Sequence, residues 1–483
     1  MWKGELKKID DYTYEIPRDE RRGMRVPGKF YIAPEGLEHV LAEDGLDQLV
    51  NVATLPGIQK YSLAMPDIHW GYGFPIGGVA AFDEKEGGII SPGGVGYDIN
   101  CGVRLIRTTM MVKDVKNRIE DITHQMYRDV PVGMGDRGYI NVSSTELKRV
   151  MEKGSAWAVE NDMGTKADLE ATEDGGFIEG ADATFASKKA VKRGQPQLGS
   201  LGSGNHFIEV QEIEEIFNEP AASVMGLKKG GLSILVHTGS RGFGHQCCDD
   251  SLVEMQKAVQ KYKIELPDRQ LACAPLYSPE AKEYLALMRA AANFAWCNRQ
   301  IITHAIRKGL SRLLGKSWEE LGLYVVYDLA HNIAKIEKHE VDGVVKTLCI
   351  HRKGATRAFA LGHPLVPAKY KAIGQPVIIP GSMGTASYVL VGTEKAMKET
   401  FGSCAHGAGR LLGRREALRE LDHEEFLEEM RRKNIVIRAG SKRTLREEAP
   451  SAYKDIHMVV KTSEEAGLAL KVAKLVPLGV IKG

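Results

Sequence analysis

Asn205-His206-Phe207-Ile208-Glu209 directly follows the glycine-rich run Leu198-Gly199-Ser200-Leu201-Gly202-Ser203-Gly204. Glycine lets a backbone turn tightly and approach a ligand closely, because it has no Cβ and tolerates positive φ. The five residues after the run offer an amide, an imidazole, an aromatic ring, an apolar side chain and a carboxylate. Although a glycine-rich loop alone is a weak signal, His, Cys and Asp residues occur in similar settings elsewhere. We therefore expect this stretch to hold a metal and a nucleotide together.

The composition is typical of a globular protein with an ordinary core. The chain has 483 residues, of which 43% are hydrophobic and 27% are charged, and its formal net charge is only +2. Any binding to nucleic acid must therefore come from a local basic surface. The seven cysteines include no CxxC pair, no apolar run approaches ~20 residues, and the first residues lack a secretory pattern. We expect a cytoplasmic protein that does not enter a membrane.

Short apolar runs and helical periodicity divide the chain into alternating strands and helices. We expect strands at residues 103–108 (half-buried), 232–236, 323–327, 377–380 and 388–391. We expect helices at residues 37–52, 119–127, 181–192, 279–314 and 414–433, and another that starts at the capping sequence 143–146. Because the candidate functional residues run from Asp98 to the C-terminus, we expect one catalytic domain over residues 1–483 rather than several.

Five side chains form a candidate metal centre. His237 and His331 each lie at the end of a short apolar run, where sites on sheets tend to lie. The full set is Asp98, Cys101, His206, His237 and His331. A thiolate can bridge two metals, and the remaining ligands leave the open positions that a catalytic metal keeps. Thiolate and imidazole alone would favour zinc over manganese. Taken singly, each histidine is more often structural and the cysteine more often a small packing residue.

Two further glycine-containing turns are suited to a nucleotide. His406-Gly407-Ala408-Gly409-Arg410 precedes a charged helical segment and can form a phosphate-binding nest. A histidine at the edge of such a nest can attack a phosphate and form a phosphoramidate. The small and hydroxyl residues of 380–387 suit a ribose and phosphates. The alternatives are a glycine turn with a surface histidine for the first stretch and a plain hairpin turn for the second.

Basic residues in two stretches could follow an RNA backbone. One stretch ends in Lys189, Lys192 and Arg193, and the other is residues 351–357. The predicted RNA contacts are Arg193, Arg352, Lys353 and Arg357. The alternative for all of them is a solvated surface. We assign the runs Arg414-Arg415 and Arg431-Arg432-Lys433, which sit among many acids, to such a surface, and the cysteines other than Cys101 to packing.

Seven ordered segments are together far more specific than any one of them. They are residues 96–102, 202–209, 237–242, 331–332, 351–357, 380–384 and 406–410. In these segments and at the terminal Lys482, the chain resembles the RtcB family of RNA ligases, and its length and final Lys-Gly resemble the archaeal branch. The resemblance covers nearly the whole chain. It implies an α+β fold with mixed sheets and surrounding helices in a single large domain, not a doubly wound sheet.

The resemblance also implies an activity and its cofactors. A family member would be a GTP- and Mn²⁺-dependent ligase of tRNA splicing and RNA repair, joining RNA 2′,3′-cyclic phosphate or 3′-phosphate ends to 5′-hydroxyl ends. By this resemblance His406 becomes guanylylated, the five metal candidates bind two Mn²⁺ ions with Cys101 bridging, and manganese replaces the zinc that ligand softness favours. The implied guanylate-binding residues are Asn205, His206, Phe207, Ile208, Glu209, His331, Asn332, Pro380, Gly381, Ser382, Met383, Ser387, His406, Gly407, Ala408, Gly409 and Lys482.

Two of these residues can read the base. Guanine presents two adjacent donors and an O6 acceptor, so Glu209 can accept from the donors and Lys482 can donate to O6. The implied partners are RNA such as tRNA exon halves, GTP and the small activator archease, and we expect a monomer. Two other functions stay open at this point. A binuclear metallophosphoesterase would need the metals without His406 or Lys482, and a non-catalytic RNA-binding protein would need neither.

Overall fold

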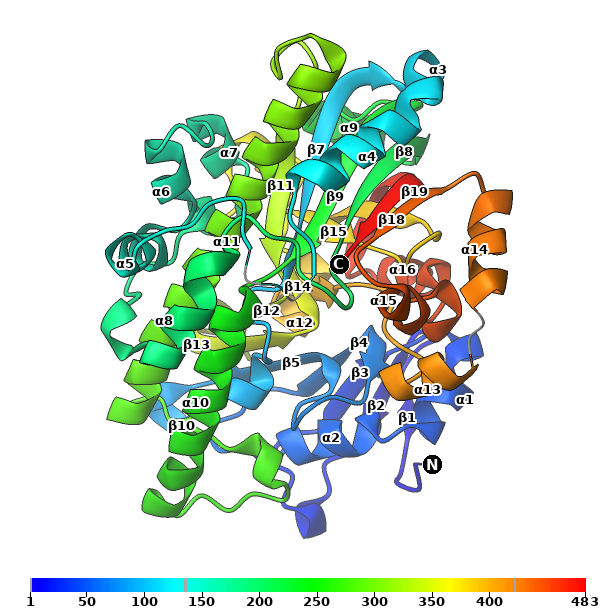
Figure 1. Ribbon diagram of the computed structural model, residues 1–483. Coiled ribbons are helices and arrows are strands. Elements are labelled where there is room, and N and C mark those ends of the chain that lie inside the picture. The colour runs from blue at the N-terminus through cyan, green and yellow to red at the C-terminus, as the bar shows by residue number, and fades with distance from the viewer. Residues whose placement is uncertain (1, 134, 136, 421–422) are drawn as a thin grey trace.

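The computed structural model describes residues 2–133, 135, 137–420 and 423–483. Its two large mixed sheets lie one above the other in Figure 1. The lower sheet has the strand order β1-β2-β3-β4-β5-β13-β12. The bounds of these strands are β1 Lys7–Lys8, β2 Thr13–Ile16, β3 Gly28–Tyr31, β4 Ser62–His69, β5 Ile76–Phe82, β12 Asn332–Val341 and β13 Val344–Lys353.

The upper sheet carries predicted site residues on four of its strands: Phe207, Ile208 and Glu209 on β8, His237 on β9, Ser387 on β16 and Lys482 on β19. Its order is β11-β7-β9-β8-β19-β16-β15, and β18 pairs in parallel with β19. The bounds are β7 Gly102–Met111, β8 Phe207–Ile216, β9 Gly231–Thr238, β11 Tyr324–Ala330, β15 Pro376–Ile379, β16 Ser387–Gly392, β18 Val436–Ala439 and β19 Ala469–Lys482. Two small ribbons pair β6 (Ile89–Ile90) with β10 (Ala274–Pro275) and β14 (Ala355–Arg357) with β17 (Ser403–Ala405).

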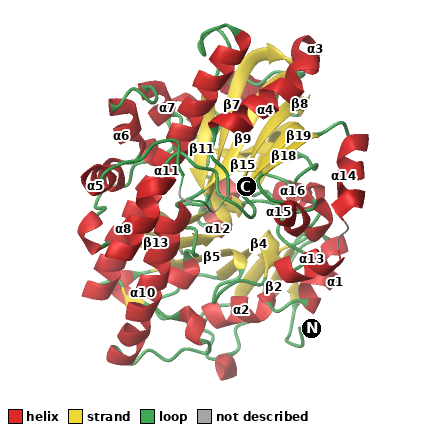
Figure 2. Ribbon diagram, viewed as in Figure 1, coloured by secondary structure: helices red, strands yellow, loops and turns green. Residues whose placement is uncertain are grey.

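Helices surround both sheets, as Figure 2 shows. The longest described helix, α11 (Pro279–Leu314), begins at Ser278, whose side chain accepts from the Ala281 amide, and packs along α10 (Arg241–Lys261). The remaining α-helices are α1 Pro34–Ala42, α2 Gly45–Val52, α3 Val112–Val115, α4 Ile119–Asp129, α5 Ser144–Lys153, α6 Ser155–Glu160, α7 Lys166–Glu170, α8 Lys188–Gly194, α9 Glu219–Met225, α12 Glu394–Thr400, α13 Arg414–Glu420, α14 His423–Arg432, α15 Lys442–Glu447 and α16 Ile456–Glu465. No helix in the described ranges is long and apolar enough to cross a membrane. The predicted α+β class is confirmed.

Several predicted elements are present with different bounds. The helix expected over 37–52 is divided into α1 and α2, and most of 181–192 lies before α8, which begins at Lys188. The helix expected over 414–433 is two helices, α13 and α14, and residues 421–422 lie outside the described residues. The prediction that 103–108 is half-buried was wrong, because Arg104 is fully buried and its guanidinium binds Asp328 at 2.7 Å. The sequence analysis also missed β19, whose last residue is Lys482.

Candidate active site

Strand pairing in the upper sheet brings the predicted metal ligands to one edge. β9 pairs antiparallel with both β7 and β8, and β11 pairs antiparallel with β7. The starts of β7 and β8 and the ends of β9 and β11 therefore meet. Gly102 is opposite Thr238 and also opposite Ala330, while Phe207 is opposite His237. The four ligand-bearing segments thus converge although they are far apart in sequence.

The five candidate ligands form two groups that share Cys101. One group is Cys101, His237 and His331, and the other is Asp98, Cys101 and His206; within each, the ligand atoms lie within 4.8 Å of one another. The Cys101 Sγ is 3.5 Å from His206 Nε2 and 3.3 Å from His237 Nε2. His206 Nε2 is 2.8 Å from Asp98 Oδ2. A sulfur placed between two such groups has the position of a bridging ligand.

The donor set fits two adjacent cations. The Nε2 atoms of His237 and His331 face each other at 3.2 Å, and burial together with neighbouring imidazoles lowers the pKa of both rings. Both rings are therefore neutral ligands, and a cation would use the lone pairs that otherwise face one another. Burial, followed by the charge of Asp98, raises the pKa of the Cys101 thiol. A bound cation would reverse that and favour the thiolate.

Outer contacts fix the orientation of these ligands. His206 Nδ1 lies 3.2 Å from the Leu201 carbonyl, which leaves Nε2 directed at the cluster. The backbone N–H of Ser240 donates to Asp98 Oδ1 at 3.1 Å. Burial would raise the pKa of Asp98, but His206 outweighs it and holds that pKa well below its usual range. The carboxylate is therefore ionised, as a metal ligand must be.

His406 lies beside the cluster and is held by an acid that the sequence analysis missed. Its ring is in edge-to-face contact with His331, with centroids 4.8 Å apart, and its Nδ1 lies 2.5 Å from Asp67 Oδ2. Asp67 is in β4 and fully buried, and it also accepts from the backbone N–H groups of His406 and Gly407 at 3.1 and 3.3 Å. An Nδ1–H donated to a carboxylate leaves Nε2 with a free lone pair. The arrangement gives His406 one reactive nitrogen.

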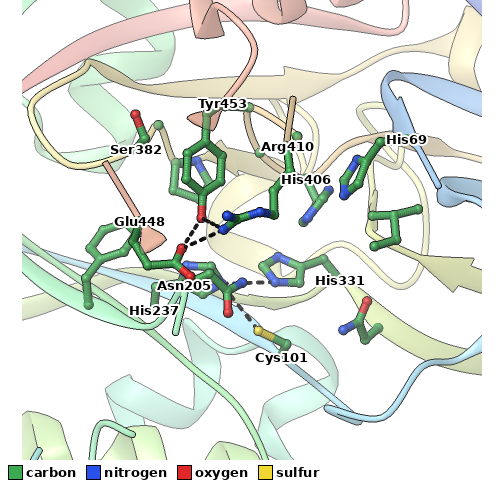
Figure 3. A pocket seen from close by; sticks show the side chains of 18 of the residues that line it. His69, Cys101, Asn205, His237, His331, Ser382, His406, Arg410, Glu448 and Tyr453 are labelled. Atoms are coloured by element: carbon green, nitrogen blue, oxygen red, sulfur yellow. Dashed lines mark hydrogen bonds and ion pairs between the residues drawn. The ribbon is translucent and has the colours of Figure 1, made fainter. Parts of the chain in front are cut away.

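A cavity of about 300 Å³ connects this histidine with the cluster. Figure 3 shows His406 and Arg410 between His69 on one side and Tyr453 and Glu448 on the other, with Cys101 below. The cavity is lined by most of the predicted nucleotide-binding residues, namely Asn205, Phe207, His331, Asn332, Pro380, Gly381, Ser382, Met383, His406, Gly407, Ala408, Gly409 and Lys482.

Four predicted nucleotide-binding residues, His206, Ile208, Glu209 and Ser387, are not among the residues that line the cavity, although Glu209 and Ser387 share a hydrogen-bond partner. Gln211 Nε2 donates to both Glu209 Oε2 and Ser387 Oγ, at 2.8 and 3.1 Å. Glu209 Oε1 is buried with no hydrogen-bond partner among the described residues. Burial raises the pKa of Glu209 to about 8 against the opposing effects of Gln211 and Lys482, and burial lowers the pKa of Lys482 to about 8. The side chain of Ile208 is buried in the core on the α4 side of the sheet.

Arg410, Glu448 and Tyr453 line the cavity with polar groups to which no role was assigned from sequence. Arg410 Nη1 donates to Glu448 Oε2 at 3.1 Å and to the Tyr453 hydroxyl at 3.0 Å. The Tyr453 hydroxyl in turn donates to Glu448. The predicted surface residue Arg414 also lines the cavity and lies 3.5 Å from Glu448. Arg410 stood in the quoted glycine motif, but nothing in the local sequence marked Glu448 or Tyr453.

The predicted RNA contacts divide into an exposed and a buried group. Arg193 is exposed, and its Nη1 donates to Gln246 at 3.1 Å. Arg352 is fully buried and makes two 2.8 Å hydrogen bonds to Glu337. Arg357 is also buried and bonds Asp174 at 2.9 Å. The prediction that these two arginines contact RNA is therefore corrected: Arg352 pairs with buried Glu337, Arg357 pairs with Asp174 from beneath the surface, and neither guanidinium presents a surface to a phosphate backbone.

Lys353 differs from both groups. It is buried but lines the cavity, and its Nζ donates to the carbonyls of Tyr72 and Phe74 at 2.6 and 2.9 Å. Burial lowers its pKa to about 7. The six other cysteines are buried and free, as the packing assignment predicts.

Known proteins match nearly the whole chain. Residues 48–483 match the family described as tRNA-splicing ligase RtcB. The tRNA-splicing ligase RtcB of Archaeoglobus fulgidus is 53% identical over 480 residues, which is 99% of each chain. The proteins of the same name from Methanococcus maripaludis and Thermococcus kodakarensis are each 52% identical, over 481 and 478 residues, covering 100% and 99% of each chain. The matched range contains every residue that lines the cavity.

Proposed function

The chain belongs to the RtcB family of tRNA-splicing ligases and is thus an RNA ligase, and from this premise we propose that it joins RNA ends through a guanylylated His406. The observation that carries the proposal is the hydrogen bond from His406 Nδ1 to buried Asp67. His406 lines the same cavity as Cys101, His237 and His331, which form one of the two ligand groups and share Cys101 with the other. A binuclear phosphoesterase would need the metals but would not need His406 as a covalent nucleophile. A non-catalytic RNA-binding protein would have no use for the ligand groups either.

The first step is guanylylation of His406. The Nε2 lone pair forms a bond to the α-phosphorus of GTP, the bond from that phosphorus to the bridging oxygen breaks, and pyrophosphate leaves with the electron pair. Positive charge develops on the imidazole as the bond forms, and Asp67, 2.5 Å from Nδ1, stabilises it. Gly409 lets the turn after His406 pack against β4, because its φ is +75° and a Cβ there would lie 2.6 Å from the Asp67 carbonyl oxygen.

Two metal ions fit the adjacent ligand groups. We assign Asp98, Cys101 and His206 to one ion and Cys101, His237 and His331 to the other, with Cys101 shared. When bound, Mn²⁺ would neutralise the triphosphate charge and make the α-phosphorus more electrophilic. The assignment of manganese rests on the family resemblance, since the ligand atoms themselves also suit zinc.

The guanine would be read by buried polar groups. Glu209 Oε1 has no partner among the described residues and can accept from a guanine donor, and that contact would favour the ionised carboxylate. Lys482 Nζ now donates to the Gly204 carbonyl at 3.0 Å and can turn to O6. Tyr453, Glu448 and Ser382 line the same side of the cavity and can bind the rest of the nucleoside.

Two transfers complete the joining. An oxygen of the RNA 3′-phosphate attacks the guanylyl phosphorus and displaces His406, which recovers its lone pair. The 5′-hydroxyl oxygen then attacks the RNA phosphorus, loses its proton, and releases GMP. A 2′,3′-cyclic phosphate must first be opened by water to give the 3′-phosphate. Exposed Arg193 is the remaining candidate for a backbone contact outside the cavity.

The proposal extends to the context of the reaction. We propose tRNA exon halves and broken RNA as substrates, one catalytic domain over residues 1–483 that acts as a cytoplasmic monomer, and archease as an activator. The single domain is supported by the cavity, whose lining residues run from His69 to Lys482.

The test is covalent labelling with GTP that carries a radioactive α-phosphate. Wild-type protein with Mn²⁺ should retain label on a denaturing gel, and the bond should be labile to acid and stable to alkali, as phosphoramidates are. His406→Ala should not label, whereas replacement of the cavity-distant His457 should leave labelling intact. Label in His406→Ala, or an acid-stable bond in wild type, would exclude the proposed intermediate.

A further inference from the structure

The loop after β4 carries an unusually exposed tryptophan. Trp70 is 60% exposed, whereas the other four tryptophans are buried or half-buried. In the sequence it stands between His69 and Tyr72, both of which line the cavity. In the described part of the chain, no ring contact or hydrogen bond engages its side chain. A large exposed aromatic ring of this kind is available to bind a partner.

Three side chains hold the backbone of this loop. The buried amide of Gln48 donates to the Gly71 carbonyl at 2.6 Å and accepts from the Gly71 N–H at 2.9 Å. Gln270 accepts from the Gly73 N–H at 2.9 Å. Lys353 donates to the Tyr72 and Phe74 carbonyls, as described above. The backbone of the loop is therefore held in place, and a ligand that binds Trp70 and Tyr72 does not have to order it.

The position of the loop indicates which substrate it faces. In Figure 3, Glu448 and Tyr453 lie on one side of His406, and His69 lies on the opposite side. We assign the Glu448 and Tyr453 side to the nucleoside. The other side of His406 is left for the RNA phosphate that takes up the guanylyl group. Tyr72 follows His69 in the same loop and lines the cavity, and its ring meets Tyr97 edge to face at 5.6 Å. An RNA that brings its 3′-phosphate to His406 past His69 would therefore come close to this loop.

We propose that Trp70 and Tyr72 form a stacking platform for the last nucleobases of the RNA strand that ends in the 3′-phosphate. This inference rests on the proposed ligase function. Unpaired bases at RNA ends bind proteins by stacking on aromatic rings, and such stacking tolerates any base because every base has a π-face. The platform would position the 3′-phosphate for attack without restricting which RNAs are joined.

The experiment is a thermodynamic cycle between protein and RNA. Affinities are measured for wild type and Trp70→Ala with a short 3′-phosphate RNA and with the same RNA carrying an abasic site at its last or next-to-last nucleotide. We expect Trp70→Ala to weaken binding of the intact RNA roughly tenfold. We expect little further loss with one of the two abasic RNAs, because the two changes remove the same contact. Additive losses with both abasic RNAs would overturn the proposal.

Matched variants separate stacking from other effects. Trp70→Phe should retain most of the affinity and Trp70→Leu should not, since only phenylalanine keeps a π-face. Tyr277→Ala removes a 55% exposed aromatic ring away from the cavity and should change nothing. An RNA with a 5′-hydroxyl and no 3′-phosphate should bind Trp70→Ala as well as it binds wild type. Equal weakening for that RNA would overturn the assignment to the 3′-phosphate strand.

Labelling distinguishes failure of this inference from failure of the proposed function. Trp70→Ala should label with GTP as wild type does, while the joined product forms more slowly. If wild type does not label, the ligase mechanism fails. If wild type labels and Trp70→Ala joins RNA at the wild-type rate under subsaturating RNA, only the stacking platform fails.

Discussion

Replacing Asp67 with asparagine tests whether His406 depends on one buried carboxylate. Asp67 is fully buried, and one of its oxygens accepts from His406 Nδ1 at 2.5 Å and from two backbone N–H groups. The asparagine side chain would have nearly the same shape but no charge. Its NH₂ group could also face the ring, and Nδ1 would then have to accept, which places the proton on Nε2 and removes the nucleophile.

The magnitude follows from these two effects. A hydrogen bond to a charged group contributes about 1.5–3 kcal/mol, which is roughly 10- to 150-fold in rate. A histidine held in the wrong tautomer can lose about 10⁴-fold. We therefore expect guanylylation by Asp67→Asn to be slower by about 10²–10⁴. GTP binding should change much less, because the carboxylate contacts the histidine rather than the nucleotide.

The assay is single-turnover labelling at saturating GTP and Mn²⁺, with melting temperature and metal content measured on the same samples. Asp83→Asn is the matched control, because Asp83 is also buried and acts as a helix N-cap away from the cavity. Guanylylation of Asp67→Asn at the wild-type rate, with normal metal content, would refute the idea that Asp67 holds the reactive tautomer.

Three further substitutions have expected outcomes. Cys101→Ser should retain fewer than two Mn²⁺ ions after gel filtration, whereas the buried control Cys248→Ser should retain both; full occupancy in Cys101→Ser would exclude the bridge. Glu209→Gln should lower a GTP-over-ATP labelling preference that is ~10⁴ in wild type. Burial raises the pKa of Glu209 from 4.5 to about 8, so the metal-free wild-type protein should lose stability as the pH rises from 5 to 8. Glu209→Gln lacks this titration, so its melting temperature should rise relative to that of wild type over the same range. A difference in melting temperature that stays constant with pH would contradict the raised pKa. Arg352→Ala should lower the free energy of unfolding by about 3–5 kcal/mol, because Glu337 is left buried without its partner. Arg193→Ala should change the free energy of unfolding by less than ~0.5 kcal/mol, because Arg193 is exposed. Equal losses in the two variants would contradict the assignment of Arg352 to a buried ion pair and of Arg193 to the surface.

The candidate metal ligands could be predicted from sequence because local patterns mark them. Apolar runs that end in His237 or precede His331 indicate strand ends, and the glycine turn around Cys101 indicates a loop that can approach a ligand. Their convergence could not be derived from these patterns, since it depends on the antiparallel order of β7, β8, β9 and β11. The family resemblance implied that these residues share one site, and the strand pairing explains how they come together.

The residues that sequence reasoning missed or misplaced depend on contacts that no local pattern shows. Asp67 reaches His406 across 339 positions, so no spacing rule connects them. Arg352 and Arg357 sit in a basic, glycine-containing stretch that suggests a surface, yet Arg352 pairs with Glu337 on the neighbouring strand β12 and Arg357 with Asp174 from a distant segment. Burial of a charge is decided by its partner. The local sequence therefore could not distinguish an RNA contact from a buried ion pair.

The most direct test of the account follows the guanylyl group from protein to RNA. Protein labelled from radioactive GTP is freed of nucleotide and mixed, in Mn²⁺, with a 3′-phosphate RNA and a 5′-hydroxyl RNA. The account predicts that label leaves His406, appears as GMP, and is matched one for one by joined RNA. RNA that is joined while the label stays on the protein would contradict a mechanism through guanylylated His406.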